Sequence, residues 1–397
     1  MSVAQKSVGD WLLDEDAARL DLRELVGELA GRLNAEGASL LRVSAWLPTL
    51  HPELWGNQLI WSRREGCRVI RRGHDVTTTA DYVGTPGEVI HRDRVGSLRV
   101  RLDVPLEQIL QPMLRDLAAA GATDYFILSL DPGGDRPPWI AFTTDRPGGF
   151  ESDAIDRLLA MRPLLSLHFR LAAANFATRS LLEVYLGANA SRRVLAGEFR
   201  RGFGTEIRAA MWFCDMRGFT TMSDRLPPRE VVRVLDQYFE LVAGPIERHG
   251  GEILKFIGDA ALAVFPIESE ELASPCGRAL AAAEEVLDAV HGWAQADAVR
   301  PALAIGIGLH VGVVMYGNIG GRERLDFTVI GGSVNELCRV ESLCKVLGCP
   351  LLMTAEFAAG VARDDLVAVG RHALRGVAEA QEIVTTTAWS ARRPVTS

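Results

Sequence analysis

The spacing of apolar and polar residues divides the first half of the chain into a helical start, a strand-rich stretch and a second helical stretch. Residues 1–35 place apolar side chains at helical spacing, which predicts one or two amphipathic helices. Between residues 40 and 143 short apolar runs alternate with turn residues, which predicts a sheet with a helix near 106–120 beside it. Residues 150–185 return to helical spacing.

The second helical stretch carries an apolar seam with alternating spacings of three and four residues. Such a seam is the a/d pattern of a two-helix coil, here about three heptads long. It predicts either a helix that pairs with a second copy of the chain or a helix that packs on its own domain. Pro163 marks the start of this helix or a kink in it. The seam consists of Leu164, Leu167, Leu171, Ala174, Thr178, Leu181 and Tyr185.

After a basic, glycine-bearing junction near residues 190–204, strand and helix patterns alternate. This alternation indicates an α/β or α+β domain of about 190 residues. The expected elements, in order, are a strand (207–215), a helix from residue 227, a hairpin (250–265), a helix (270–297), two strands (302–312 and 326–332) and a helix (333–348).

Composition makes several classes of protein improbable. The chain has 397 residues, 48% hydrophobic and 24% charged, so it is globular and long enough for two or three domains. A net charge of −8 without a long basic stretch argues against nucleic-acid binding. The most apolar run, 302–316, is shorter than the roughly 20 residues of a membrane-spanning helix.

The cysteines and the first residues predict a cytoplasmic protein. The six cysteines form no CxxC pair and no zinc-ligand spacing, so we expect reduced thiols. The N-terminus is acidic and lacks the apolar stretch of a secretory signal. Cys338, Cys344 and Cys349 cluster near one predicted helix, where burial is expected and a redox switch is the alternative.

Two aspartates at strand ends are the first candidates for chemistry. Asp215 ends the run 207–215 and precedes Gly218, after which backbone N–H groups enter a helix. Asp259 lies in the Gly258–Asp259 turn of the predicted hairpin. Two such carboxylates suit divalent cations that assist phosphoryl chemistry. Each aspartate taken alone more often forms a turn or a helix cap.

Three segments together carry a family resemblance. FCDMRGFTTMSD, HGGEILKFIGDAALAVF and IGLHVGVVMYGNIGGRERLDFTVIGGSVNELCRVE follow one another in the order and spacing that resembles the class III nucleotidyl cyclase homology domain. The resemblance covers about residues 203–390 and includes the closing LRGVAEAQEIV segment. It implies an α+β fold with a ferredoxin-like βαββαβ core.

The resemblance also implies roles for individual residues. Asp215 and Asp259 match the aspartates that bind two Mg²⁺ or Mn²⁺ ions in that family. Asn335 matches the asparagine that orients the ribose, and Arg339 the arginine that stabilises charge on the α-phosphoryl group. The spacing of four residues places these two side chains on one helix face. Further residues expected near the triphosphate are Gly218, Phe219 and Thr220, with Arg375, Arg217 and Arg322 as looser candidates.

Lys255 and Thr328 match the family's purine-selecting pair. A lysine donates to adenine N1, and a threonine hydroxyl accepts from the 6-amino group. Against guanine N1–H the lysine would meet donor with donor, which favours ATP over GTP. The expected activity is therefore that of an adenylate cyclase, which forms 3′,5′-cyclic AMP and pyrophosphate. The alternatives are a guanylate or other nucleotide cyclase, and a catalytically silent nucleotide-binding module.

In the family the metal-binding aspartates come from one chain and the other four residues from its partner. This chain carries all six, which implies two equivalent sites in a symmetric homodimer. The intervening residues Glu336, Leu337 and Cys338 lie on other helix faces, and Glu336 could reshape the local potential.

The N-terminal half resembles a GAF-type sensor module only in its architecture. The expected division is therefore a GAF-like α/β domain at 1–160, a signalling helix and linker at 161–203, and the catalytic domain at 204–397. An unidentified small-molecule regulator is a possible ligand of the first domain. Its histidines are expected to be surface or hydrogen-bonded residues and its tryptophans core residues rather than a ligand cage: His51, His74, His91, His168, Trp46, Trp55, Trp61 and Trp139.

Overall fold

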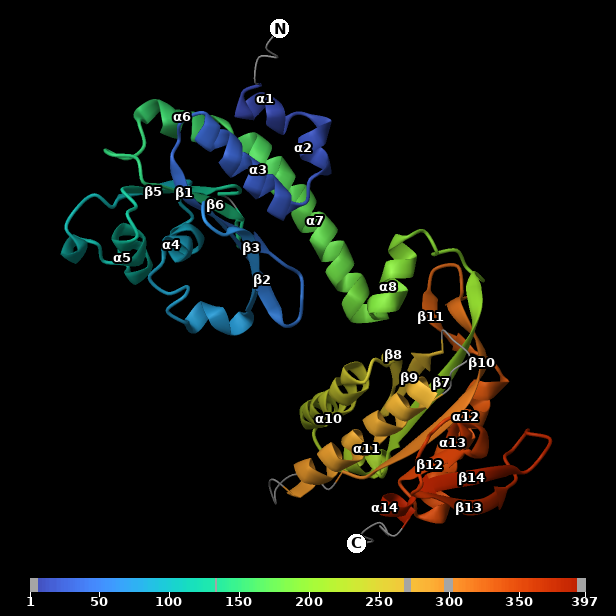
Figure 1. Cartoon of the computed structure of the whole chain (residues 1–397). Helices are drawn as coiled ribbons and strands as arrows, with labels where there is room; N and C mark the ends of the chain where they lie inside the picture. Colours follow the sequence, from blue (N-terminus) through green and yellow to red (C-terminus); the bar gives the residue numbers. More distant parts are fainter. Residues whose placement is uncertain (1–5, 133, 268–272, 296–302, 391–397) are drawn as a thin grey trace. The chain divides into compact units, whose positions relative to one another are not determined.

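The computed structural model describes residues 6–132, 134–267, 273–295 and 303–390 (Figure 1). The chain divides into two compact units, Met1–Leu181 and Leu182–Ser397. Each unit has its own sheet and its own buried cores. Among the described residues, no helix combines the length and the apolar character that crossing a membrane requires.

The N-terminal unit begins with three helices, where the spacing of residues 1–35 predicted one or two. The third helix starts with a capping box, in which Asp21 accepts from the backbone N–H of Glu24 and Glu24 accepts from that of Asp21. Its apolar face is buried against the sheet, with Val26 and Leu29 fully enclosed. The helices are α1 (Val8–Leu12), α2 (Glu15–Arg19) and α3 (Leu22–Ala35).

The sheet of this unit has six antiparallel strands in the order β3-β2-β1-β6-β5-β4. Side chains alternate between its faces, so Val43 and Ala45 face a core with α1–α3, whereas Trp46 faces a second core. The likeness to a GAF-type module stays a prediction. The strands are β1 (Leu40–Pro48), β2 (Leu54–Ser62), β3 (Gly66–Gly73), β4 (Ser97–Arg101), β5 (Asp124–Ser129) and β6 (Trp139–Thr144).

The second core of this sheet is covered by short helices that the sequence showed only in part. The helix expected near 106–120 is a 3₁₀ turn (Leu106–Gln108) followed by α5 (Pro112–Ala119), because Pro112 begins a new helix. A further helix, α4 (Pro86–Asp93), begins at Thr85, whose hydroxyl accepts from the backbone N–H of Glu88. No expectation had covered α4.

After α6 (Ser152–Ala160), one continuous helix, α7 (Arg162–Leu186), contains the predicted seam. Leu165 and Phe169 are fully buried in the N-terminal core. Seam residues Leu167, Leu171 and Tyr185 are instead 64%, 52% and 79% exposed. One side of α7 therefore packs on its own domain, whereas the side chains of the predicted seam are largely exposed to solvent.

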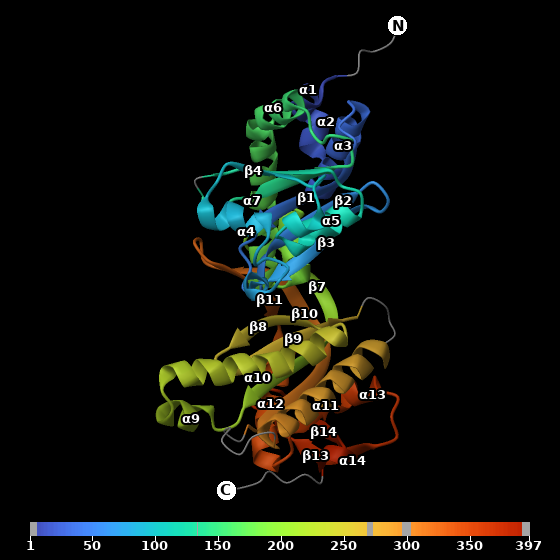
Figure 2. The same ribbon diagram turned by 90° about the vertical axis from the view of Figure 1, so that its left-hand side faces the viewer.

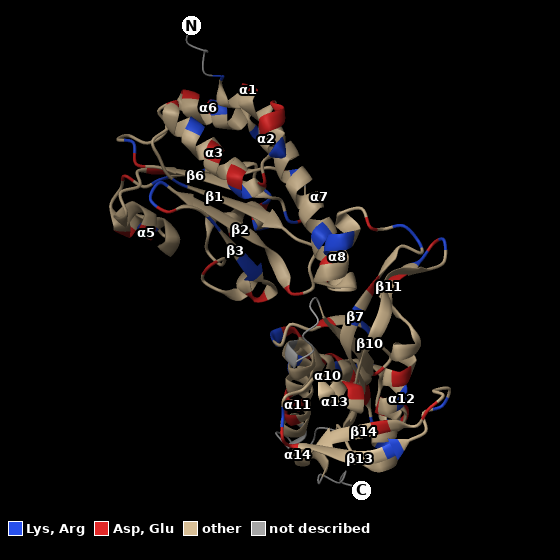
Figure 3. Ribbon diagram, turned by 45° about the vertical axis from the view of Figure 1, so that its right-hand side comes forward, with Lys and Arg blue, Asp and Glu red and all other residues tan. Residues whose placement is uncertain are grey.

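The boundary between the compact units lies within α7, between Leu181 and Leu182, rather than at residue 160 or near 190–204. The first part of α7 packs on the N-terminal core, which extends that unit past residue 160. Helix α8 (Ala188–Leu195) belongs to the C-terminal unit, where the guanidinium of Arg193 lies 5.3 Å from the ring centre of Tyr316. Figure 3 shows the basic residues of α8 in blue, on the last turn of that helix.

The C-terminal unit follows the βαββαβ order, and its strands pair as β10-β7-β9-β8, so the expected ferredoxin-like core is confirmed. The sheet continues beyond β10 through β12, β14 and β13, and β11 pairs with the far part of β10. The core elements are β7 (Gly204–Met216), α10 (Pro228–Arg248), β8 (Glu252–Ile257), β9 (Ala260–Pro266), α11 (Ala273–Gln295) and β10 (Ile305–Gly320). The others are α9 (Phe219–Arg225), β11 (Leu325–Ile330), α12 (Gly332–Leu347), β12 (Leu351–Thr354), α13 (Ala355–Ala359), β13 (Leu366–His372), β14 (Gln381–Thr386) and α14 (Thr387–Ser390).

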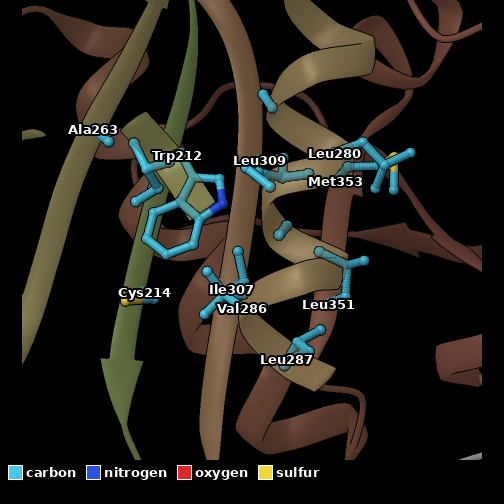
Figure 4. Close-up of a cluster of buried hydrophobic side chains, with 14 of the residues drawn as sticks. Trp212, Cys214, Ala263, Leu280, Val286, Leu287, Ile307, Leu309, Leu351 and Met353 are labelled. Carbon is cyan, nitrogen blue, oxygen red and sulfur yellow. The ribbon is translucent and has the colours of Figure 1, made fainter. Parts of the chain in front are cut away.

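Helices α10 and α11 lie side by side over one face of this sheet (Figure 2). Trp212 of β7 is fully buried there, among aliphatic side chains of α11 and β10 such as Val286 and Ile307 (Figure 4). Burial of a side chain of this size contributes several kcal/mol to stability. This core holds β7 and β10 in register over thirteen residue pairs.

Helix α12 covers the opposite face and approaches the backbone of β10 closely, because β10 has glycines beneath it. A Cβ added at Gly308 would stand 2.7 Å from the backbone nitrogen of Glu341, and one added at Gly312 would stand 2.3 Å from Oγ of Ser333. Since α12 carries Asn335 and Arg339, these glycines set the height of both side chains above the sheet.

We therefore expect Gly308→Ala to destabilise the C-terminal unit by about 1–3 kcal/mol, because the clash is with helix backbone. Urea denaturation of the purified protein measures the change. The matched control is Gly277→Ala in α11, where a Cβ meets nothing within 4 Å. That change should cost nothing and can add up to about 1 kcal/mol. Equal effects of the two substitutions would contradict close packing at Gly308.

Candidate active site

Strand β7 and the β8–β9 hairpin bring Asp215 and Asp259 close together. The pairing of β7 with β9 aligns Cys214 with Ala261, so the last residues of β7 lie beside the hairpin tip. Gly258 has φ +64° at the first position of this two-residue turn, which a residue with a side chain rarely adopts. Burial raises the pKa of Asp259, and the charge of Asp215 raises that pKa further. The two carboxylates therefore repel each other.

This donor set fits a divalent cation that is bound partly by its substrate. Carboxylate oxygens are hard ligands that Mg²⁺ and Mn²⁺ accept, and here two carboxylates lie close together. In the described part of the chain, no group of three or more His, Cys, Asp or Glu side chains forms a metal site. Asp215 and Asp259 could thus hold such an ion only together with water or phosphate oxygens, as Mg²⁺ commonly does.

The segment expected to contact phosphate follows directly. Gly218 has φ +76° and precedes α9, which begins with Phe219 and Thr220. A Cβ at position 218 would meet nothing within 4 Å, so glycine serves the backbone conformation here and not a close approach within the chain. The carbonyl of Gly218 accepts from the N–H of Met222, 3.0 Å away.

Arg217, a looser phosphate candidate, is engaged inside the protein. Its Nη2 lies 2.8 Å from a carboxylate oxygen of Glu341, whose side chain is only 5% exposed. Burial raises the pKa of Glu341 to about 7, although the charge of Arg217 opposes that rise. Glycine at 306 makes the pair possible, because a Cβ there would overlap the guanidinium. Arg217 thus ties the end of β7 to α12.

A β-bulge in β8 orients Lys255. Ile253 pairs with Ala263 and Lys255 with Leu262, so Leu254 is an extra residue. In a regular strand Lys255 would share the side of Ile253, which packs with α10 and α11. The bulge turns Lys255 to the side of Leu262 instead. Its Nζ then lies 3.1 Å from Oδ2 of Asp326 on β11.

Thr328 lies two residues beyond Asp326 on the same strand. Its residue is 6% exposed, and its hydroxyl has no hydrogen-bond partner among the described residues. A buried hydroxyl left without a partner costs about 1–3 kcal/mol, so a ligand atom there would be favoured. Asp326 was not among the expected residues. Its spacing of two from Thr328 in a strand is the signal that could have identified it.

Asn335 and Arg339 both lie on α12, four residues apart as expected. Asn335 is exposed and Arg339 half-buried. The LRGV segment reaches the same place, because a Cβ added at Gly376 would stand 3.2 Å from Nη1 of Arg339. Arg375 beside it is exposed, and so is Arg322 in the loop between β10 and β11.

The chain keeps the carboxylates apart from Thr328. On β10, the pairing partner of Asp215 is Gly306 and that of Thr328 is Gly317. Eleven residues of strand span about 36 Å along its path. No hydrogen bond or ion pair joins either aspartate to Lys255, Thr328, Asn335 or Arg339, all of which are described. Thr328 of one chain thus lies far from its own carboxylates along β10.

The remaining expectations concern cysteines and histidines. All six cysteines are free, and Cys344 and Cys349 are buried as expected while Cys338 is half-buried. Burial raises the pKa of Cys338, which opposes thiolate formation. The four N-terminal histidines each have a hydrogen-bonding neighbour: His51 with the N–H of Glu53, His74 with the carbonyl of His51, His91 with Tyr82, and His168 with the carbonyl of Leu12.

Comparison with known proteins finds similarity for part of the C-terminal unit. Residues 205–353 match the family model described as adenylate and guanylate cyclase catalytic domain. An adenylate cyclase of Anabaena cylindrica is 35% identical over 153 residues, which are 38% of this chain and 30% of that protein. An uncharacterized protein of Mycobacterium tuberculosis is 33% identical over 214 residues, 52% of this chain and 38% of its own. This chain spans about a third of the length of these relatives.

A solved bacterial light-regulated adenylyl cyclase has a similar fold. It is 20% identical with a TM-score of 0.50, and the match covers 64% of this chain and 84% of that one. The C-terminal unit therefore contains a class III adenylate/guanylate cyclase catalytic domain.

A buried histidine beneath α12 gives this unit a pH-dependent stability. His310 of β10 is 5% exposed, its Nδ1 lies 3.0 Å from the hydroxyl of Thr354, and its Nε2 lies 3.3 Å from Glu336. Burial lowers the pKa of His310 to about 4. Glu336 thus faces His310 from the side of α12.

Because the folded His310 resists protonation and the unfolded one does not, we expect stability to fall as the pH drops from about 6.5 towards 4. Urea denaturation at pH 7.5 and pH 5 should show a loss about 2 kcal/mol larger in the native protein than in His310→Gln. If the carboxylate of Glu336 instead held a charged His310, the native protein would lose less than the variant.

Proposed function

We propose that this protein is an adenylate cyclase that converts ATP to 3′,5′-cyclic AMP and pyrophosphate. The observation that carries the proposal is the base-facing group, in which Lys255 is held by Asp326 two residues from the unpartnered hydroxyl of Thr328. A lysine donor and a hydroxyl acceptor match N1 and the 6-amino group of adenine. Guanine would place its N1–H against the lysine, donor against donor.

The two aspartates would supply the metal-dependent part of the proposed reaction. Asp215 and Asp259 would hold two Mg²⁺ or Mn²⁺ ions, which supply activation of the ribose 3′-hydroxyl and neutralise the triphosphate. In the reaction the 3′-oxygen loses its proton to solvent and forms a bond to the α-phosphorus, while the bond from that phosphorus to the bridging oxygen breaks and releases pyrophosphate.

The remaining candidate residues would orient the nucleotide and stabilise charge on its phosphates. Asn335 would hold the ribose, and the guanidinium of Arg339 would stabilise charge on the α-phosphoryl oxygens. The backbone N–H groups of Gly218, Phe219 and Thr220 would contact phosphate, with exposed Arg375 as a further cation. Asp326 would act as a positioning residue, because it fixes the lysine and not the base.

A complete site needs two copies of the chain. Asp215 and Thr328 are separated by eleven positions along β10, so a symmetric pair would join the carboxylates of one copy to the base-facing residues of the other. The exposed seam of α7, with Leu167 and Leu171, fits a helix that pairs in such a homodimer.

The direct test incubates the full-length protein with each of the four nucleoside triphosphates and Mg²⁺ or Mn²⁺. We expect cyclic AMP from ATP as the main product, identified by mass spectrometry. Asp215→Asn should lose activity at least about 100-fold, since it removes a metal ligand. The control Asp236→Asn changes an exposed aspartate of α10 and should retain full activity. Cyclic GMP as the main product would refute the base assignment.

Mixing two inactive variants tests the shared site. Asp215→Asn damages one group and Arg339→Ala the other, so each is inactive alone. In a random mixture half of the dimers are mixed, and each has one intact site, so about a quarter of full activity should return. No recovery after verified subunit exchange would show that one chain builds its own site.

A further inference from the structure

The N-terminal unit contains a pocket that the cyclase chemistry does not use. It lies on the face of the sheet covered by α4 and α5, and it encloses about 630 Å³ of empty space, part of it open to solvent. Ser44 and Trp46 of β1 and Trp139 of β6 contribute to its wall, together with the rings of Trp55 and Tyr82.

Three polar atoms in this wall are buried without partners. The indole nitrogens of Trp46 and Trp139 and the hydroxyl of Ser44 make no hydrogen bond with any described residue. The three residues are 4%, 8% and 7% exposed. Buried N–H groups are almost always paired in folded proteins, and each unpaired one costs about 1–3 kcal/mol. Three in one pocket indicate a missing partner with hydrogen-bond acceptors.

Gly87 of α4 keeps one of these donors accessible. A Cβ at this position would stand 3.3 Å from Nε1 of Trp139 and 3.0 Å from its ring. Any larger side chain would therefore cover the indole N–H. The helix approaches the ring without closing the space in front of its nitrogen.

The pocket also contains a cation without a counter-charge. Arg42 of β1 is half-buried, makes no ion pair or hydrogen bond with any described residue, and has its pKa lowered by burial. The other arginine of the wall, Arg72, is satisfied by Gln58 and Asp81. Burial lowers the pKa of His91, which disfavours a charged imidazole there. These charges leave one positive charge in the pocket.

Aromatic rings form one side of the pocket. The ring centres of Trp46 and Trp55 lie 4.6 Å apart, those of Trp55 and Tyr82 4.9 Å, and those of Trp55 and His91 5.4 Å. A hydrogen bond of 3.0 Å between the hydroxyl of Tyr82 and Nδ1 of His91 fixes two of these rings. Such a wall favours a flat, unsaturated ligand that can stack or pack against ring edges.

From these features we propose that the pocket binds a small aromatic carboxylate. The carboxylate would pair with Arg42, and its ring would lie among Trp46, Trp55 and Tyr82. Further acceptor atoms would receive the N–H groups of Trp46 and Trp139, which can only donate. One unpaired guanidinium balances a monoanion, whereas a dianion would leave a buried excess of negative charge. This proposal does not depend on the proposed cyclase activity.

Calorimetric titration of the full-length protein tests the assignment with matched probes. Benzoate and 2-naphthoate represent the class. The neutral amide of 2-naphthoate tests the charge, cyclohexanecarboxylate tests the ring, and 2-naphthyl phosphate tests the dianion. We expect 2-naphthoate to bind at least about tenfold more tightly than each of these three comparison compounds.

Two variants connect binding to the named groups. Arg42→Met should weaken 2-naphthoate at least about tenfold and leave the amide unchanged. The control Arg64→Met alters an exposed arginine outside the pocket and should change neither. Trp139→Phe should weaken 2-naphthoate several-fold, because it removes a donor that has no partner in the ligand-free protein. Since Trp139 also packs in the core, affinity is compared under conditions where the variant is fully folded, as its unfolding transition shows.

The proposal is wrong if neither aromatic carboxylate binds at about 1 mM, a dissociation constant that corresponds to about −4 kcal/mol. It is also wrong if the neutral amide equals the carboxylate, or if Arg42→Met keeps full affinity while its unfolding transition is native-like. Tighter binding of the naphthyl phosphate would overturn the assignment of a monoanion.

Discussion

Pairing along β10 is the constraint on which the C-terminal unit depends. This strand runs from Ile305 to Gly320 and pairs with β7 over thirteen positions, with β12 near its start and with β11 near its end. The carboxylates therefore lie by one end of the strand and Thr328 by the other. A strand cannot be shortened without breaking its ladder of hydrogen bonds, so the separation of Asp215 and Thr328 along β10 is fixed. The proposed homodimer would bring the carboxylates of one copy to Thr328 of the other.

The glycines of β10 allow α12 to pack directly on the backbone of this strand. Where Gly306 and Gly308 lack side chains, the buried pair of Arg217 and Glu341 and the backbone of the helix occupy the space. A buried ion pair of this kind adds little net stability, because removing both charges from water is costly. It does fix one arrangement, and it couples the end of β7, which carries Asp215, to the helix that carries Arg339. The position of each group thus depends on the other within one chain.

Much of this architecture could be predicted from the sequence, because local patterns encode it. The run ending at Asp215, the Gly258–Asp259 turn and the four-residue spacing of Asn335 and Arg339 all appear in the structure as expected. The bulge at Leu254 could not be predicted, since an extra residue in one strand is defined only by its partner. The same holds for Asp326 and for the inward turn of Arg217, which depend on residues distant in sequence. The division within α7 was missed because basic, glycine-bearing composition marked α8 as a linker, whereas Asn189 of α8 donates to the buried Glu252.

The unpaired polar groups of each unit indicate the charge of the ligand that would bind there. In the C-terminal unit burial and then the charge of Asp215 raise the pKa of Asp259, so a positive group would be favoured beside these two carboxylates. In the N-terminal pocket the imbalance is opposite, because Arg42, Trp46 and Trp139 are hydrogen-bond donors without an acceptor among the described residues. Neither imbalance is a natural resting state of a protein interior, where buried polar groups are paired. Of the four tryptophans expected as core residues, Trp46 and Trp139 are buried and Trp55 and Trp61 are half-buried. The two buried ones have indole donors without a partner among the described residues. The indole nitrogen of Trp212 in the C-terminal core also lacks a partner among those residues, so neither burial nor one unpaired donor separates a core role from a ligand-binding role. What distinguishes the N-terminal site is that several unpaired donors line one pocket together with Arg42.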